Sequence, residues 1–226
     1  LSPEITCKAG DRIYYYREVA QEVVIPLQEK ILYCDEHFLV ADKPHFLPVI
    51  PSGKYVQQTL LARLQQTTGI AHLSPIHRID KDTAGLVLFS TNPKTRDAYQ
   101  ALFRQHAVEK TYHAIAPINP SLYFPLQYSS RVVEDEQFFR SKEIAGKTNS
   151  ETHLSIIDQS DRLALYALKP ITGKKHQLRV QMAALKIPIV NDVLYPLVTQ
   201  REDDDFSRPL QLLAKSIAFI DPMTQQ

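Results

Sequence analysis

The first part of the chain alternates short apolar runs with polar turns, a spacing that predicts two strands followed by a helix. Residues 31–44, ILYCDEHFLVADKP, hold two apolar runs on either side of an acidic pair, as two short β-strands would. In residues 56–69, VQQTLLARLQQTTG, three leucines share one helical face, and Gly69 is a typical C-terminal stop. The pattern therefore predicts a β-β-α unit.

A second unit follows in residues 86–108. The apolar run 86–89 predicts a strand, and 91–108, TNPKTRDAYQALFRQHAV, predicts a helix. We expect Asn92 to cap this helix and Pro93 to occupy its first position. The apolar stripe of the helix is formed by Ala98, Tyr99, Leu102 and Phe103.

The second half of the chain is dominated by strand patterns. Residues 109–117, EKTYHAIAP, alternate in polarity, and 152–158 and 162–168 are two further apolar segments joined by a turn. Residues 172–188, TGKKHQLRVQMAALKIP, predict a helix entered through a Thr-Gly pair, and 209–222 predict a closing buried strand. Long β segments with few helices predict an α+β fold: a mixed, largely antiparallel sheet with flanking helices and a cleft between two lobes.

The sequence predicts one catalytic domain, because no repeat, low-complexity tract or linker divides it. We expect residues 1–28 to form an N-terminal extension packed on a core domain of residues 29–226. The first ten residues lack the apolar core of a secretory signal, and no apolar run is long enough to predict a membrane span.

The cysteines, Cys7 and Cys34, form neither a CxxC pair nor a zinc spacing. We expect a cytoplasmic protein with reduced thiols; a disulfide between the two is the alternative.

The net charge and the motifs limit the ligands and the classes of reaction that the chain can support. The net charge is only +1, so a nucleic-acid partner would require the cations to be gathered on one face. The acidic run 201–206, REDDDF, is typical of a solvated loop. The sequence has no HExxH, EF-hand, Walker or GxGxxG motif and only 6 glycines, so we expect neither a metal site nor a glycine-rich phosphate-binding loop. It has no GxSxG either, although this alone does not exclude Ser/His/Asp catalysis.

Three stretches place polar groups against apolar framework. In residues 74–90, SPIHRIDKDTAGLVLFS, Asp80 stands two residues after Arg78 and just before an apolar run. Tyr112 lies on a predicted strand. His176 and Arg179 would share a helix face, from which a guanidinium can hold a carboxylate ionised. The residues alone leave open a cleft enzyme, an RNA binder, or ordinary turn, core and surface roles.

Together the stretches resemble the RluA family of pseudouridine synthases. The family's central motif is close to HRLDxxTSGLLL, and residues 77–88 read HRIDKDTAGLVL. EKxYxA is matched by EKTYHA at 109–114, and TGRxHQLRxHLxxxGxPIxGDxxYG by TGKKHQLRVQMAALKIPIVNDVLYP at 172–196. A closing LLLHA-like strand is matched by LQLLA at 210–214. The resemblance implies the pseudouridine synthase fold and the isomerisation of uridine in RNA without a cofactor.

The resemblance also implies roles for single residues. Asp80 matches the catalytic aspartate, which either attacks C1′ or removes the C2′ proton as the glycosidic bond breaks. Arg179 matches the arginine paired with it. Tyr112 matches the tyrosine against the uracil, which can help to remove the C5 proton, and Leu212 the apolar residue on the other side of the base. Arg78 matches the arginine that fills the gap left by an everted uridine.

Further cations are expected to contact RNA. His77 opens the first motif and His176 lies within the third, and both are predicted to contribute to the RNA-binding surface. We expect the following side chains to meet phosphates: Lys81, Lys174 and Lys175, with Lys94, Arg96 and Arg104 on the neighbouring helix.

The expected partner is a structured rRNA or tRNA, bound by a monomer without the S4-like domain of many relatives. A non-catalytic RNA-binding module on the same fold is the main alternative. A glycoside hydrolase using Asp80 is a third, but it would usually need a second carboxylate across the cleft.

Overall fold

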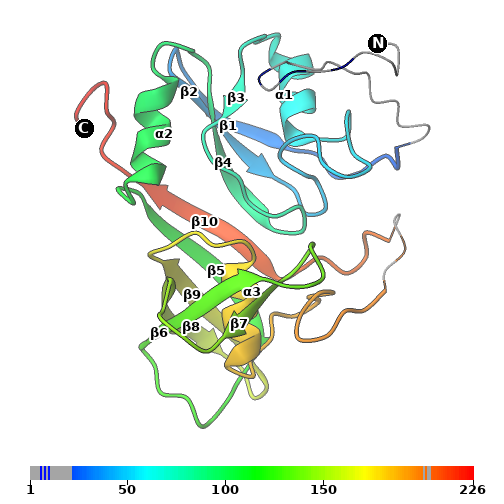
Figure 1. The fold of residues 1–226 in the computed structure, drawn as a ribbon, viewed down its shortest axis with the longest axis vertical. Coiled ribbons are helices and arrows are strands. Elements are labelled where there is room, and N and C mark those ends of the chain that lie inside the picture. Colours follow the sequence, from blue (N-terminus) through cyan, green and yellow to red (C-terminus); the bar gives the residue numbers. More distant parts are fainter. Residues whose placement is uncertain (1–5, 7, 9, 11–21, 201, 203–204) are drawn as a thin grey trace.

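The computed structural model describes residues 6, 8, 10, 22–200, 202 and 205–226 (Figure 1). Most of the predicted extension, Cys7 and part of the acidic run 201–206 lie outside the described residues. In chain order the elements are β1 (Lys30–Cys34), β2 (Phe38–Lys43), α1 (Leu60–Thr68), β3 (Ser74–Pro75), β4 (Ala84–Ser90), α2 (Arg96–Arg104), β5 (Glu109–Pro117), β6 (Leu126–Glu134), β7 (Ser141–Ile144), β8 (Ser150–Gln159), β9 (Leu163–Pro170), α3 (Gln177–Ala184) and β10 (Leu212–Ala218).

A single sheet organises the fold. Its strand order is β1-β2-β4-β10-β5-β9-β8-β6-β7, and the short β3 pairs with β4. Every pairing is antiparallel except that between β4 and β10. The predicted α+β class, with a mixed and largely antiparallel sheet, is therefore confirmed.

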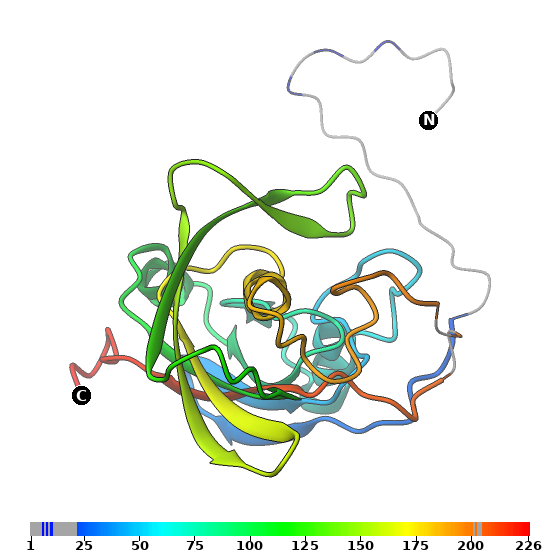
Figure 2. The ribbon, with the colours of Figure 1, turned by 90° about the horizontal axis from the view of Figure 1, so that it is seen from below.

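Apolar cores form on both sides of the β4–β10 junction. In one half, α1 packs on β2 and β4 through side chains that include Leu39, Leu60, Leu64 and Val87. In the other half, the sheet curves around α3 (Figure 2), whose Leu178 and Met182 pack on Leu154, Tyr166 and Leu168. The final strand, β10, joins the halves because it pairs with β4 on one edge and β5 on the other.

The β4–β10 junction requires a glycine. Gly85 has φ +108°, and a Cβ atom there would lie 2.2 Å from the Ala214 carbonyl oxygen. The backbones of the two parallel strands thus approach more closely than any side chain permits. The strand β4 accordingly begins at Ala84, earlier than the predicted strand, and continues directly from the segment that carries Asp80.

The predicted end of the first helix is confirmed. Gly69 terminates α1 in the left-handed conformation, with φ 70°. At the other end, the Thr59 side chain accepts a hydrogen bond from the backbone N–H of Ala62. The helix therefore starts at Leu60, the first of the three leucines, and residues 56–59 precede it.

Two predicted helix starts are wrong. Thr95, and not Asn92, precedes α2; the Asn92 side chain accepts from the Lys94 N–H in a turn before the helix. Similarly, α3 begins at Gln177 rather than at the Thr-Gly pair. His176 adopts a left-handed conformation with φ 55°, so it belongs to the loop before the helix.

Residues 22–28 pack against α1. The Glu22 carboxylate accepts hydrogen bonds from the backbone N–H groups of Gln57 and Gln58. Ile25 is only 2% exposed and belongs to the first core. Arg63 donates to the carbonyl oxygens of Ile25 and Leu27. Within the described part of the chain, no helix has the length and apolarity needed to cross a membrane.

Candidate active site

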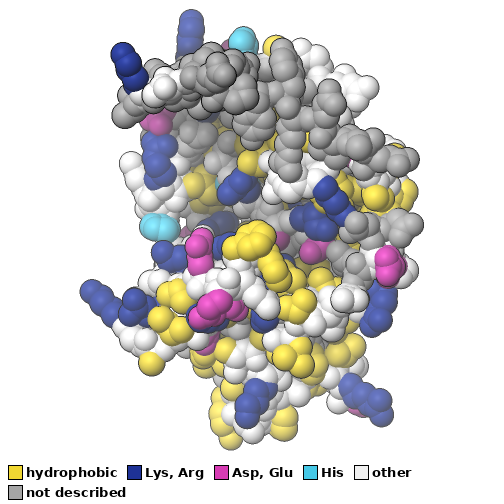
Figure 3. Space-filling view, turned by 45° about the vertical axis from the view of Figure 1, so that its right-hand side comes forward, with side chains coloured by type: hydrophobic (Ala, Val, Ile, Leu, Met, Phe, Trp, Pro, Cys, Tyr) yellow, Lys and Arg dark blue, Asp and Glu magenta, His cyan; other side chains and the backbone are white. Residues whose placement is uncertain are grey.

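Most of the predicted site residues, including the three predicted catalytic side chains, line one cavity of about 310 Å³ at the junction of the two halves. Asp80, Tyr112 and Arg179 all line it, although they come from the β3–β4 segment, β5 and α3. Leu212 of β10 contributes an apolar wall and is 3% exposed. Figure 3 shows Lys and Arg side chains on both sides of the hollowed middle of this face. Four segments that are far apart in the sequence thus build a single site.

Asp80 is held between two basic side chains. Its Oδ2 lies 3.5 Å from Arg179 Nη1 and 3.8 Å from His176 Nε2. The Asp80 side chain is 30% exposed, whereas that of Arg179 is 2% exposed. The carboxylate therefore faces the cavity from a buried cationic support and keeps lone pairs available to a bound molecule.

The shortest bonds of Arg179 go to a residue that the sequence reasoning did not single out. Its Nε and Nη2 donate to the two carboxylate oxygens of Asp192 at 2.8 and 2.6 Å. The Asp192 carboxylate, 1% exposed, also accepts from the backbone N–H groups of Leu194 and Tyr195. Asp192 lies inside the matched stretch 172–196, so its position was a signal that could have been used. This bidentate pair fixes the plane of the guanidinium.

Tyr195 contacts both His176 and Arg179, the two basic side chains beside Asp80. Its hydroxyl accepts from the Ser141 N–H, donates to the Ser141 carbonyl and lies 3.0 Å from His176 Nδ1. The guanidinium carbons of Arg179 and Arg140 lie 5.4 and 4.9 Å from its ring centroid. Both basic neighbours of Asp80 are thus positioned by one aromatic side chain.

The protonation states follow from burial and charge. Burial lowers the pKa of Arg179, but the hydrogen bond and charge of Asp192, with Asp80, outweigh it and raise the pKa overall. Burial lowers the pKa of His176 despite the opposing effect of Asp80, so its imidazole is neutral at pH 7. Burial, and secondarily the charge of Asp80, raises the pKa of Tyr112 and keeps its phenol protonated.

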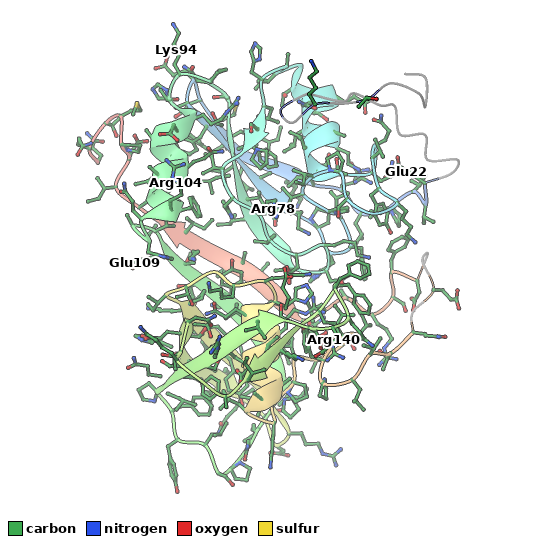
Figure 4. The ribbon with its side chains drawn as sticks, viewed as in Figure 1. Glu22, Arg78, Lys94, Arg104, Glu109 and Arg140 are labelled. Carbon is green, nitrogen blue, oxygen red and sulfur yellow. The ribbon has the colours of Figure 1, made fainter. Side chains whose placement is uncertain are left out.

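His77 and Arg78 are neighbours with different environments. His77 Nε2 accepts from the Leu88 N–H, and its ring stacks on Phe103 with centroids 4.6 Å apart. Burial lowers the pKa of His77 to about 3, so it is a neutral part of the cavity wall. Arg78 is exposed and also lines the cavity (Figure 4).

The three predicted lysines occupy different places. Lys174 lines the cavity. The Lys175 ammonium donates to the Phe138 carbonyl, on the loop between β6 and β7, at 2.6 Å. Lys81 lies over the Tyr55 ring in a second cavity. A phosphate contact by any of them stays a prediction.

Two of the cations predicted on and beside α2 contact other groups of the protein. Arg96 donates to the His72 carbonyl, and Arg104 pairs with Asp97 at 2.8 Å. Lys110 of β5 lines the cavity, although the sequence reasoning assigned it no role. It stands two residues before Tyr112 and therefore on the same face of the strand.

A buried lysine supports the segment that carries Asp80. Lys43 is 0% exposed, and its ammonium donates to the carbonyls of Pro44, Leu47 and Lys81 at 2.8–2.9 Å. Burial lowers the pKa of Lys43 to about 7. Because Lys81 follows Asp80 directly, this amine fixes the backbone beside the carboxylate.

The described lining of the cavity offers a single carboxylate for acid, base or nucleophilic chemistry. Among the described residues that line it, Asp80 is the only acid. A glycoside hydrolase would usually place a second carboxyl group across the site. Nor does the described part of the chain bring together three or more His, Cys, Asp or Glu side chains suited to hold a metal ion.

Comparison with known proteins identifies the family of the chain. Residues 37–184 match the family model for RNA pseudouridylate synthase. The chain is 30% identical to the tRNA pseudouridine synthase C of Vibrio parahaemolyticus, over 89% of this chain and 88% of that protein. It is 29% identical to an RNA pseudouridine synthase of Synechocystis, over 86% and 68% of the two chains.

A solved structure shares the fold. Human RNA pseudouridylate synthase domain containing 1 superposes with a TM-score of 0.73, at 23% identity over 90% of this chain and 83% of that one. The family match covers more than half of the 226 residues and includes Asp80, Tyr112 and Arg179. The chain therefore belongs to the RluA family of RNA pseudouridine synthases.

Proposed function

We propose that the chain isomerises a uridine of tRNA to pseudouridine, with Asp80 as the catalytic carboxylate. The observation that carries this proposal is the placement of Asp80: it is the one acid among the described residues of the cavity, 3.5 Å from a fixed guanidinium. Cleavage of the glycosidic bond leaves an electron-poor ribose, and a carboxylate beside it stabilises or captures that centre.

The reaction rearranges one nucleotide without a net gain or loss of atoms. The N1–C1′ bond breaks, the uracil turns, and C5 bonds to C1′. The C5 proton is then lost and N1 carries a proton. In one route Asp80 forms and later releases a bond to C1′; in the other it takes the C2′ proton and returns it. Both routes use the carboxylate form of Asp80, and the Arg179 guanidinium, 3.5 Å away, supplies a counterion for it.

The cavity walls fit the base. Tyr112 and Leu212 offer an aromatic and an aliphatic surface between which a uracil ring can lie. Because burial keeps the Tyr112 phenol protonated, we assign it to contact with the base, and not to removal of the C5 proton. His176, neutral and 3.8 Å from Asp80, is assigned to orienting the carboxylate.

Such a cavity admits a nucleotide only after it has left the helical stack, at a cost of a few kcal/mol. Arg78 is exposed at the lining, where a planar guanidinium can replace the missing base through stacking and hydrogen bonds. Lys110 and Lys174 supply positive charge for the flanking phosphates.

The relative from Vibrio parahaemolyticus is called a tRNA pseudouridine synthase, which supports tRNA over rRNA as the substrate. The decisive experiment incubates the purified chain with unmodified tRNA transcripts and with rRNA fragments, each labelled with tritium at uracil C5. We expect tritium release and a mapped pseudouridine in a tRNA only. Release from rRNA alone would contradict the substrate assignment, and binding without release would contradict catalysis. Monomeric state and cytoplasmic location stay predictions.

A further inference from the structure

The loop between β6 and β7 presents an aromatic side chain to solvent. Phe138 is 83% exposed, although its neighbour Phe139 is only 40% exposed and packs edge-on against it, with ring centroids 5.7 Å apart. A phenylalanine is seldom so exposed in a segment that has fixed contacts, and exposed aromatic residues are enriched where a protein binds another molecule.

The tip of this loop is held in place. The Phe138 carbonyl accepts a hydrogen bond from Lys175 Nζ at 2.6 Å. Arg140 donates to the Pro196 carbonyl at 3.3 Å and lies over the ring of Tyr195. The ring of Phe138 is therefore presented by an anchored backbone, so little conformational entropy is lost when it binds.

The anchored tip lies beside the active site. Lys175 stands between Lys174 and His176, which both line the Asp80 cavity. On its other side, Phe139 shares a second cavity with Lys81, the residue after Asp80. In Figures 1 and 2 the β6–β7 hairpin extends past α3 toward the half that contains α1. The tip at Phe138 and Phe139 thus lies beside two segments close to the catalytic carboxylate, residues 174–176 and Lys81.

The charges around the tip suit RNA. The two acids of the loop are neutralised locally, since Asp135 contacts Arg140 and Glu136 contacts Lys142. The Lys175 ammonium lies at the backbone carbonyl of Phe138 and adds a positive charge to the tip. An aromatic face next to a cation is the arrangement that binds an unpaired nucleobase and its phosphate.

We propose that Phe138 is a stacking platform for an unpaired nucleobase of the substrate RNA, next to the uridine that enters the cavity. The inference rests on the proposed function. Eversion of a uridine leaves its neighbour without a stacking partner, and a fixed aromatic ring just outside the cavity restores that contact. Phe138 takes no part in the chemistry, so its contribution lies in the affinity for RNA.

The test compares four variants on one unmodified tRNA transcript that the wild-type chain modifies. Phe138→Ala should raise KM about 5- to 150-fold, the range for loss of one stacked base, with little change in kcat. Phe138→Trp should keep a near wild-type KM. Phe138→Leu, which retains apolar area but no aromatic face, should behave as Phe138→Ala. Tyr123→Ala removes an equally exposed aromatic residue, 85% exposed on the β5–β6 connection, and should change nothing.

A second readout reports the contact directly. The fluorescent base 2-aminopurine, placed next to the target uridine, should be quenched on binding to the wild type and less so with Phe138→Ala. A wild-type KM for Phe138→Ala or for Phe138→Leu would overturn the stacking assignment. Absence of pseudouridine with the wild-type chain on every transcript would instead contradict the proposed function.

Discussion

Two carboxylates flank the same guanidinium, and they differ in almost every other respect. Asp192 is 1% exposed and receives two hydrogen bonds from Arg179, of 2.6 and 2.8 Å, and two from backbone N–H groups. Asp80 is 30% exposed, and its nearest cationic atom is 3.5 Å away. One acid is fully satisfied by the fold, and the other is left with capacity for a substrate.

The same division separates His77 from Arg78. The imidazole of His77 is used by a backbone hydrogen bond and by stacking on Phe103. Arg78, the next residue, is exposed at the cavity. Both residues line the cavity, but the ring of His77 is already engaged, whereas the guanidinium of Arg78 is exposed. Polar side chains adjacent in sequence can thus differ in role according to the contacts that the fold gives them.

The largest expected effect concerns Asp80. Asp80→Asn keeps the shape of the side chain but removes the charge that the chemistry needs, so we expect turnover to fall by about 10³-fold or more. The free energy of unfolding should change by less than about 1 kcal/mol, because the carboxylate is partly exposed. Tritium release and urea denaturation measure the two quantities. A variant with near-normal turnover would remove Asp80 from the mechanism.

Asp192→Asn is the matched substitution on the other side of Arg179. It leaves a buried guanidinium without its counterion, so we expect a loss of about 3 kcal/mol or more in the free energy of unfolding, accompanied by lower activity. Urea denaturation followed by circular dichroism gives the value. Should Asp192→Asn prove as stable as Asp80→Asn, the distinction between a structural and a catalytic carboxylate would be wrong.

The lowered pKa of His77 should make the free energy of unfolding depend on pH. Its pKa is about 3 in the folded protein against an ordinary 6.5, so between these values the unfolded chain binds a proton that the folded protein excludes. Acidification through this window therefore lowers stability, by about 2 kcal/mol at pH 5 from this group, and the loss is absent above the ordinary pKa. His77→Gln keeps an acceptor for the Leu88 N–H but does not titrate. Denaturation at pH 7.5 and pH 5 should show a smaller acid loss in the variant; equal losses would refute this account.

The smallest effect concerns Arg78. If its guanidinium fills the gap left by the everted uridine, Arg78→Ala should reduce kcat/KM on a structured RNA about tenfold more than on an unstructured strand of the same sequence, a difference of about 1.4 kcal/mol. Lys94→Ala, on an exposed turn before α2, serves as the control for a general loss of charge. Equal losses on both RNAs would leave Arg78 as an ordinary phosphate contact.

The local sequence predicted several of the strands and the end of α1, and the motifs shared with the RluA family singled out Asp80, Tyr112 and Arg179. Period-two apolar patterns and a glycine stop act over a few residues, so they can be read without knowledge of the fold. The starts of α2 and α3 could not, because turns at Asn92 and His176 compete with the first helical turn through local hydrogen bonds and a left-handed backbone.

Only the tertiary structure decided which polar residues serve the interior and which face the cavity. The partner of Arg179 is 13 residues away at Asp192, and Lys43 caps a carbonyl 38 residues away at Lys81. Nothing in the local pattern marks Lys43 as fully buried, since a lysine is ordinarily a surface residue. Burial is a property of the packed sheet: it encloses Lys43 and Asp192 and leaves Asp80 and Arg78 open to a ligand.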